Sequence, residues 1–371
     1  MMTKNRKVKA STALLAAALM LSAGISSNGA AVSAFTTTTP LQRTAMVAGN
    51  RKSTTFVSQS SSSIQEKSLV LTDEEVSPII RLKKGEKEKV VNAFGAWCAI
   101  VSILTGPPWA LAMAIVNALA DKYEDFDPNR AVYDYTGKVW SRVFLSLISS
   151  YPEITGDVKG LKERDGACLY VANHASWLDI PVICTVLDPV FKFISKAELS
   201  GVPCIGQQLT GGHHILIERD DRRSQLRTFK EGVKWLKSGV PLMAFPEGKR
   251  SQDGKLMDFK GGMFSLAVKV GVPVVPITLS NTHAVMPSNA LFPVQSGGDG
   301  VLRVHVHDPI YPEGKTDSEI ADEVRKAFMS KLPADQQPVE PVVVEEEEIS
   351  EIVADAIISE NNSTGKKVAT S

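Results

Sequence analysis

CLYVANHASWLD, residues 168–179, is the stretch that decides the fold. Its first five residues are apolar and stop at the polar pair Asn173 and His174, as a buried strand does where it enters a loop. A helix can follow at residues 179–186, because Pro181 would sit in its first turn, where proline is tolerated. The stretch therefore predicts the strand, loop and helix unit of an α/β domain.

The same alternation continues along the chain. Further strands are predicted at residues 214–217, 242–245, 272–279 and 301–306, further helices at residues 222–238 and 262–270, and a last helix after Asp317. Strands that alternate with helices indicate a mostly parallel or mixed sheet flanked by helices. Loops at the carboxyl ends of such strands are where functional residues gather. Residues 151–332 are therefore expected to form one domain that carries the functional site.

The charges of the chain are balanced overall. Lys and Arg number 41, as do Asp and Glu, and 43% of the residues are hydrophobic, which is typical of a globular protein. Acidic residues concentrate in residues 333–371, which contain few aromatic residues and are expected to form a disordered tail. A nucleic-acid-binding protein would need a basic surface, so the composition speaks against nucleic acid as a partner.

Residues 1–65 contain seven basic residues and no acidic one. A basic start, a short apolar run and small residues before Phe35 predict a signal peptide of about residues 1–34. Residues 35–65 are rich in Ser and Thr, as transit peptides are. The tandem resembles the two-part presequence of algae whose plastids arose by secondary endosymbiosis, and it predicts a plastid (chloroplast) membrane location. A plain secretory signal before a linker, with the endoplasmic reticulum membrane as destination, is the alternative.

Residues 66–150 are expected to hold a linker and membrane-associated helices. Residues 90–120 carry no charge and are interrupted by Gly106, Pro107 and Pro108. At ~1.5 Å per residue, each half is shorter than the ~30 Å hydrocarbon core of a membrane, and adjacent prolines should break a helix. We therefore predict an apolar hairpin that enters one leaflet. A kinked single crossing or a buried hairpin of a soluble protein would give a similar pattern.

His174 and Asp179 are the candidate catalytic residues. Histidine can accept a proton near neutral pH, and a carboxylate on one ring nitrogen would fix its tautomer and stabilise its charged form. The alternative is structural: Asp179 or Ser176 would cap the following helix, and His174 would be an ordinary loop residue.

A second polar loop, FPEGKRS at residues 245–251, follows another predicted strand. It contains a carboxylate (Glu247), a glycine suited to a tight turn (Gly248) and two cations (Lys249 and Arg250). Such a loop can place its cations and backbone N–H groups on a phosphate, although a solvated turn would have the same composition.

One further cation, Arg219, is a candidate phosphate ligand. Lys196 opens the block KAELSGVPCIG, residues 196–206, and Arg219 follows the apolar strand predicted at residues 214–217. No metal site is predicted, because no Cys or acidic cluster completes the histidine pairs at residues 213–214 and 305–307.

The order of these motifs is more specific than any one of them. The chain contains, in sequence, NHxxxxD at residues 173–179, KxELxxVPxxG at 196–206, FPEG at 245–248 and VPVVPI at 272–277. Over about residues 157–280 it thereby resembles the glycerophospholipid acyltransferase family, in particular the 1-acylglycerol-3-phosphate (lysophosphatidate) acyltransferases related to bacterial PlsC. The apolar hairpin resembles the N-terminal two-helix membrane motif of that family.

The resemblance implies a reaction and roles for the matched residues. An acyl group would pass from acyl-CoA or acyl-carrier protein to the sn-2 hydroxyl of lysophosphatidate, giving phosphatidate in phospholipid biosynthesis, with no metal or organic cofactor. His174 would deprotonate that hydroxyl, and Asp179 would hold His174. Acceptor and phosphate contacts would come from Glu247, Gly248, Arg219, Arg250 and Lys196, and the acyl-binding wall from Pro273 and Pro276.

Lys249 departs from the usual third motif of the family, which reads Phe-Pro-Glu-Gly-Thr-Arg-Ser. The added cation leaves the acceptor open, so glycerol 3-phosphate or another lysophospholipid is an alternative, as is a non-enzymatic membrane lipid-binding protein. A serine hydrolase is disfavoured, because its Gly-x-Ser-x-Gly elbow is missing from the sequence. In a plastid, the catalytic domain is expected to face the stroma.

Overall fold

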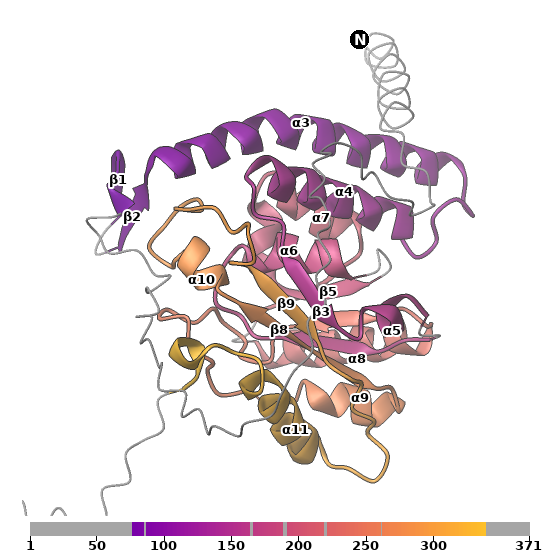
Figure 1. The fold of residues 1–371 in the computed structure, drawn as a ribbon. Helices are drawn as coiled ribbons and strands as arrows, with labels where there is room; N and C mark the ends of the chain where they lie inside the picture. The colour runs from indigo at the N-terminus through magenta and orange to yellow at the C-terminus, as the bar shows by residue number, and fades with distance from the viewer. Residues whose placement is uncertain are drawn as a thin grey trace, which may run out of the picture.

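The computed structural model describes residues 76–84, 87–163, 166–187, 191–218, 221–260 and 262–338. The predicted signal peptide, the transit-like segment and most of the predicted tail lie outside these residues. A two-stranded hairpin, β1 (Ile80–Lys84) and β2 (Lys87–Val91), comes first and leads into a helical layer and a seven-stranded sheet (Figure 1).

The large sheet is mixed and mostly parallel, as the sequence predicts. In the order β3-β9-β8-β4-β7-β5-β6, its strands are β3 (Glu153–Gly156), β9 (Arg303–Val306), β8 (Val274–Ser280), β4 (Leu169–Ala172), β7 (Leu242–Ala244), β5 (Lys192–Lys196) and β6 (Ile215–Ile217). Strands β8, β4, β7, β5 and β6 are parallel, whereas β9 runs antiparallel to β8 and parallel to β3. The five parallel strands therefore end at one edge of the sheet.

Helices cover both faces of this sheet (Figure 1). They are α3 (Ala93–Lys122), α4 (Ala131–Leu147), α5 (Val158–Glu163), α6 (Asp179–Val186), α7 (Ile205–Gly211), α8 (Arg222–Lys237), α9 (Phe264–Val270), α10 (Thr282–Val285) and α11 (Asp317–Met329), with 3-10 turns η1 (Ala197–Gly201) and η2 (Ala334–Gln336). Along β4, Tyr170 and Ala172 join a core with α4 and α6, whereas Leu169 and Val171 join a second core with α8, α9 and α11. Because successive side chains of β4 point to opposite faces of the sheet, one apolar core forms on each face.

Residues 90–120 do not form the predicted hairpin. Instead, α3 is one helix of 30 residues that contains both Pro107 and Pro108 (Figure 1). Each proline removes a backbone donor, but both lie on the exposed side, while an apolar face that includes Val101 and Trp109 continues past them against α4 and α7. Tertiary packing therefore overrides the break, and the helical hairpin consists of α3 and α4.

Aromatic packing joins these two helices. Trp109 of α3 stacks on Trp140 of α4 with ring centroids 4.4 Å apart, and Trp140 Nε1 donates to Thr105 Oγ1 at 3.1 Å. Within the described ranges, α3 is the one helix long and apolar enough to cross a membrane. Its outer face exposes Ile103 and Leu104, so this face is available to lipid.

Residues 333–338, predicted as the start of the disordered tail, lie against the domain instead. Gln336 is buried, and its amide Nε2 donates to Asn281 Oδ1 at 2.6 Å. Its carbonyl oxygen accepts from the N–H of Leu256 at 2.9 Å. The folded domain therefore continues past the predicted boundary at residue 332.

Candidate active site

The predicted site residues follow neighbouring strands at the carboxyl-terminal edge of the parallel strands. His174 lies just after β4, Glu247 just after β7, which pairs with β4, and Lys196 at the end of β5, which pairs with β7. Arg219 falls outside the described residues, in the connection from β6 to α8. The topology thus brings His174 and Glu247 together and places Lys196 one strand further away.

His174 and Asp179 form a close pair. Asp179 Oδ2 lies 2.7 Å from His174 Nδ1 and accepts hydrogen bonds from the N–H groups of Ala175 and Ser176, both at 2.9 Å. The Asp179 carboxylate is fully buried at the start of α6. The capping interpretation is wrong, because α6 has no side-chain cap and Asp179 is its first residue; Asp179 instead binds two N–H groups of the preceding loop and holds the histidine ring.

The ring of His174 is fixed by two contacts. Asp179 accepts a hydrogen bond from the protonated Nδ1, which leaves Nε2 as the nitrogen with an available lone pair. The ring also stacks on Phe245, with centroids 3.9 Å apart and planes 13° from parallel. The side chain is 14% exposed, and Nε2 has no hydrogen-bond partner within the described part of the chain. One nitrogen is thus held and the other is accessible, as a general base requires.

Glu247 holds the loop that carries His174. Its Oε1 accepts from the N–H of His174 at 2.6 Å, and its Oε2 accepts from the N–H of Met257 at 2.9 Å. Burial raises the pKa of Glu247 from 4.5 to about 7, the nearby Asp179 adds to the rise, and the two N–H donors oppose it. The carbonyl of His174 in turn accepts from the N–H of Ser251 at 2.9 Å. The loops after β4 and β7 are therefore locked together through the backbone.

The turn at Gly248 presents two cations at this edge. Gly248 has a φ of +71°, and a Cβ there would lie 2.9 Å from Cδ of Lys260, so the turn favours glycine. Lys249 is exposed and Arg250 is half-buried. Neither side chain has an ion-pair partner among the described residues, which leaves both charges available to an anion.

Lys196 differs from these two cations because it already has a partner. Its Nζ lies 2.7 Å from Glu198 Oε2, and both side chains are exposed. A phosphate at Lys196 would compete with this ion pair. Of the two predicted wall residues, Pro276 lies in the fully buried strand β8, opposite Val171 of β4, and Pro273 immediately precedes that strand.

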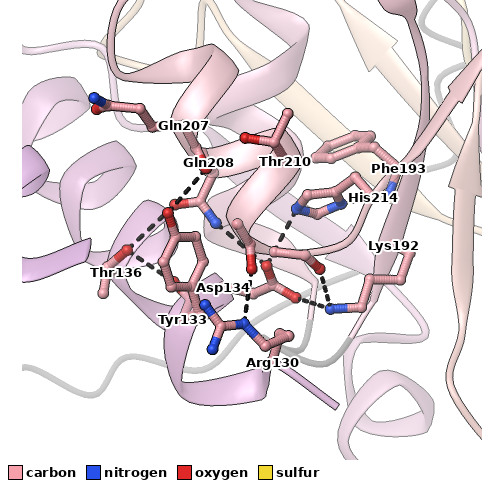
Figure 2. Close-up of polar contacts among 12 residues, drawn as sticks. Arg130, Tyr133, Asp134, Thr136, Lys192, Phe193, Gln207, Gln208, Thr210 and His214 are labelled. Atoms are coloured by element: carbon pink, nitrogen blue, oxygen red, sulfur yellow. Dashed lines mark hydrogen bonds and ion pairs between the residues drawn. The ribbon is translucent and has the colours of Figure 1, made fainter. Parts of the chain in front are cut away.

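A second histidine–carboxylate pair, not predicted from the sequence, is buried at the amino-terminal end of β5 and β6 (Figure 2). Asp134 of α4 lies 2.6 Å from Lys192 Nζ and 3.1 Å from His214 Nε2. His214 Nδ1 accepts from the N–H of Phe193 at 2.9 Å, and Lys192 Nζ donates to the carbonyl of Gly212 at 2.7 Å. A lysine at the start of a buried strand signals a buried partner, but nothing in the sequence identifies Asp134, which is 58 residues away.

The same cluster fixes the end of α7 (Figure 2). Arg130 Nε donates to the carbonyl of Gly211 at 2.7 Å, and Tyr133 Oη donates to the carbonyl of Gln207 at 2.9 Å. Gln208 Nε2 donates to Asp134 Oδ1 at 3.2 Å. Helix α4 thereby binds carbonyl groups that the end of α7 leaves free. Helix α7 begins within the block of residues 196–206, which starts at Lys196. By holding α7 from the amino-terminal end of β5 and β6, the cluster supports the segment that follows Lys196.

The remaining histidine pair is bound to hydroxyl groups. His305 Nδ1 lies 2.9 Å from Thr155 Oγ1, and His307 Nε2 lies 2.8 Å from Thr278 Oγ1. Among the described residues, no group of three or more His, Cys, Asp or Glu side chains could hold a metal ion.

Comparison with known proteins identifies the family. A family model described as "Acyltransferase" matches residues 156–280. The chain is 34% identical over 240 residues to a 1-acyl-sn-glycerol-3-phosphate acyltransferase of Chlamydomonas reinhardtii, a match that covers 65% of this chain and 68% of that protein. The chain belongs to the 1-acyl-sn-glycerol-3-phosphate acyltransferase family.

Two chloroplastic members of the family give similar values. The identity is 36% over 251 residues with the Brassica napus protein, covering 66% of this chain and 65% of that one. With the Arabidopsis thaliana protein the identity is 35% over 252 residues, covering 66% of this chain and 63% of that one. The chain thus matches slightly less than two thirds of the length of these two relatives.

A solved structure supports the fold of this acyltransferase family member. The crystal structure of PlsC, the 1-acyl-sn-glycerophosphate acyltransferase of Thermotoga maritima, superposes with a TM-score of 0.50 at 24% identity. The superposition covers 63% of this chain and 95% of the bacterial one. The sheet and its flanking helices are therefore an architecture that already exists in this family.

Proposed function

We propose that this chain transfers an acyl group from a thioester to the sn-2 hydroxyl of lysophosphatidate and so forms phosphatidate. The observation that carries the proposal is the His174–Asp179 pair, which holds Nδ1 at 2.7 Å and leaves Nε2 accessible. The family relatives carry the same activity in their names. In this chain, His174 and Glu247 follow the neighbouring strands β4 and β7 at one edge of the sheet.

In the proposed reaction, His174 is the general base. Its Nε2 takes the proton of the acceptor hydroxyl while the hydroxyl oxygen attacks the carbonyl carbon of the thioester and forms the new C–O bond. The tetrahedral centre then collapses, the C–S bond breaks, and the leaving thiolate receives the proton that His174 returns. The thioester itself supplies the activation, so acyl-CoA or acyl-carrier protein serves as co-substrate and the balance needs no further reactant.

Asp179 and Glu247 act through His174 in this scheme. The buried Asp179 carboxylate keeps the proton on Nδ1 and stabilises the imidazolium that forms when Nε2 is protonated. Glu247 binds the N–H of His174 and so sets the position of the loop. Phe245 restricts the tilt of the ring by stacking. A base that is fixed in this way loses little entropy when the acceptor arrives.

The acceptor phosphate is assigned to the cations at the same edge. Arg250 and Lys249, on the turn at Gly248, have no ion-pair partner in the described ranges, so a phosphate would not have to displace an internal carboxylate there. Arg219, which lies outside the described residues, is a further phosphate ligand in this proposal. Lys196 contributes less, because Glu198 already binds it.

We place the protein at a plastid membrane, with the catalytic domain on the stromal side and the endoplasmic reticulum membrane as the alternative. The relatives of Brassica napus and Arabidopsis thaliana are named chloroplastic, and α3 exposes an apolar outer face. If α3 and α4 lie in one leaflet, tags at the β1–β2 turn and at the α3–α4 connection are equally accessible to protease. Tags with opposite protection would mean that α3 crosses the membrane.

An acceptor and donor screen tests the activity. The full chain is incubated with acyl-CoA or acyl-carrier-protein donors and with lysophosphatidate, glycerol 3-phosphate or other lysophospholipids, and products are identified by mass spectrometry. We expect phosphatidate and the highest kcat/KM with lysophosphatidate. A higher kcat/KM with glycerol 3-phosphate would reassign the acceptor. Lipid binding without any ester product would favour the non-enzymatic alternative.

A further inference from the structure

Helix α8 carries a continuous row of cations. Its exposed residues include Arg223, Arg227, Lys230, Lys234 and Lys237, which are separated alternately by four and three positions. Residues at this spacing share one face of a helix, so the five charges form a stripe about 21 Å long at ~1.5 Å per residue. We call these five residues the α8 stripe.

The cations of the α8 stripe are balanced only in part within their own helix, because Glu231 is the one acidic residue of α8. Like charges three and four positions apart repel one another along a helix. Arg223 lies in the first turn, where a cation opposes the helix dipole, and only Lys234 and Lys237 sit near the end that favours cations. Among the described residues, the one ion pair of the stripe joins Arg227 to Asp221; it is long at 3.8 Å and exposed. In a chain with 41 basic and 41 acidic residues, such a concentration needs a reason outside the helix.

The position of α8 argues against lipid as that reason. The apolar residues of α8, such as Leu236, join the core on one face of the sheet, whereas Val101 of α3 joins the core on the other. The membrane-facing helix and the basic helix therefore lie on opposite sides of the sheet (Figure 1). When α3 contacts a membrane, the α8 stripe points toward the aqueous side.

The direction of α8 connects the stripe to the chemistry. Helix α8 begins after β6, at the edge of the sheet where β4 delivers His174, and runs back toward the opposite edge. Its first cation is thus near the reaction edge, whereas its last is about four turns away, beyond the reach of one small anionic substrate. A binding partner that uses the whole stripe must be a macromolecule with an acidic surface.

We propose that the α8 stripe docks an acidic carrier protein that delivers the acyl group as a thioester. This inference rests on the proposed acyl transfer and specifies its donor: the carrier binds along α8 and its thioester arm enters at the His174 edge. Charge complementarity across such a surface acts mainly on association and is sensitive to salt.

The test compares two donors that bear the same acyl group. The double variant Lys230→Glu/Lys234→Glu reverses the middle of the stripe, and Lys159→Glu/Lys331→Glu makes the same change in charge at exposed positions elsewhere. With acyl-carrier protein as donor, we expect the stripe variant to raise KM about tenfold, with kcat unchanged and with a weaker salt dependence than the wild type. With acyl-CoA as donor, its KM should stay within about twofold of the wild type.

Several results would overturn the docking proposal. These are an unchanged KM for acyl-carrier protein, an equal rise for both donors, or an equal rise in the control variant. A stripe variant that instead loses binding to vesicles of anionic phospholipid would assign the stripe to membrane. If the wild type transfers from neither donor, the proposed function fails. Direct titration with acyl-carrier protein then decides the docking claim, because wild type must bind it and the stripe variant must bind about tenfold more weakly.

Discussion

Two histidine–aspartate pairs lie at opposite ends of the parallel strands, and only one of them is open. In the first, Asp179 holds Nδ1 of His174, and the histidine side chain is 14% exposed. In the second, Asp134 lies 3.1 Å from Nε2 of His214, and that side chain is 4% exposed. The two pairs use the same residue types but opposite ring nitrogens.

The difference lies in what happens to the second nitrogen. His214 Nδ1 accepts from the N–H of Phe193, so both nitrogens of this ring are used inside the protein. Lys192 also neutralises Asp134, and the cluster is a closed structural unit. His174 keeps Nε2 without a partner among the described residues. A histidine–carboxylate contact therefore indicates general-base catalysis only when the other ring nitrogen is left accessible to accept a proton.

The largest expected effect separates the two histidines by activity. His174→Ala should lower kcat by about 10²-fold to 10⁴-fold, because the general base is lost, while the folded structure remains. His214→Ala should leave kcat per folded molecule close to wild type. Acyl-transfer rates and thermal melts of both variants check this. Equal turnover in the two variants would remove the distinction on which the mechanism rests.

The second prediction concerns stability, for which the buried Asp134 cluster should matter more than the active-site pair. Asp134→Ala leaves Lys192 buried without its carboxylate, which should lower the free energy of unfolding by about 3–5 kcal/mol. The matched change Asp179→Ala leaves no buried cation behind and should cost less. Urea unfolding followed by circular dichroism measures both. A larger loss for Asp179→Ala would mean that the active-site pair, not the buried cluster, supports the fold.

Glu247 offers a smaller effect that depends on pH. Its folded-state pKa of about 7 exceeds its ordinary value of 4.5, so the folded protein binds more protons between these values. The stability contributed by protonated Glu247 is therefore fully present below about pH 4.5 and is lost as pH rises through about 7, with a total on the order of 3 kcal/mol. Unfolding free energies of wild type and Glu247→Gln across this range should diverge accordingly. Parallel pH curves would contradict the raised pKa.

The smallest effect concerns the acceptor phosphate. Arg250→Ala should raise the KM for lysophosphatidate about tenfold and leave kcat nearly unchanged, because a charge-assisted contact outside the reacting bonds is lost. Lys249→Thr, which restores the usual family residue, should change this KM by less than about threefold. Initial rates against acceptor concentration distinguish the two. A raised donor KM in Arg250→Ala would move this arginine to the donor.

The sequence predicted most of the sheet and the contact between His174 and Asp179, because both depend on local patterns. The predicted helix at residues 179–186 coincides with α6, and its first residue is the carboxylate that holds the base. The break at Pro107 and Pro108 was predicted wrongly, since the buried face of α3 that continues past them depends on contacts with α4 and α7. The Asp134 cluster joins segments that are far apart in the sequence, and no local sequence pattern predicts that kind of contact.

Glu247 falls between these cases. Its motif marked it as a site residue, but its hydrogen bonds to the N–H groups of His174 and Met257 depend on how the loops after β4 and β7 pack. Sequence patterns show which residues reach the carboxyl edge of a parallel sheet. They do not show which of their atoms are already used by the protein.

The most direct test of the central claim is a double-mutant cycle on turnover with lysophosphatidate, using His174→Ala, Asp179→Asn and the double variant. If Asp179 acts only by holding His174, Asp179→Asn lowers kcat when His174 is present, and the double variant turns over at the same rate as His174→Ala alone. If instead the two losses multiply in the double variant, Asp179 contributes independently of His174, and the pair is not the general-base unit described above.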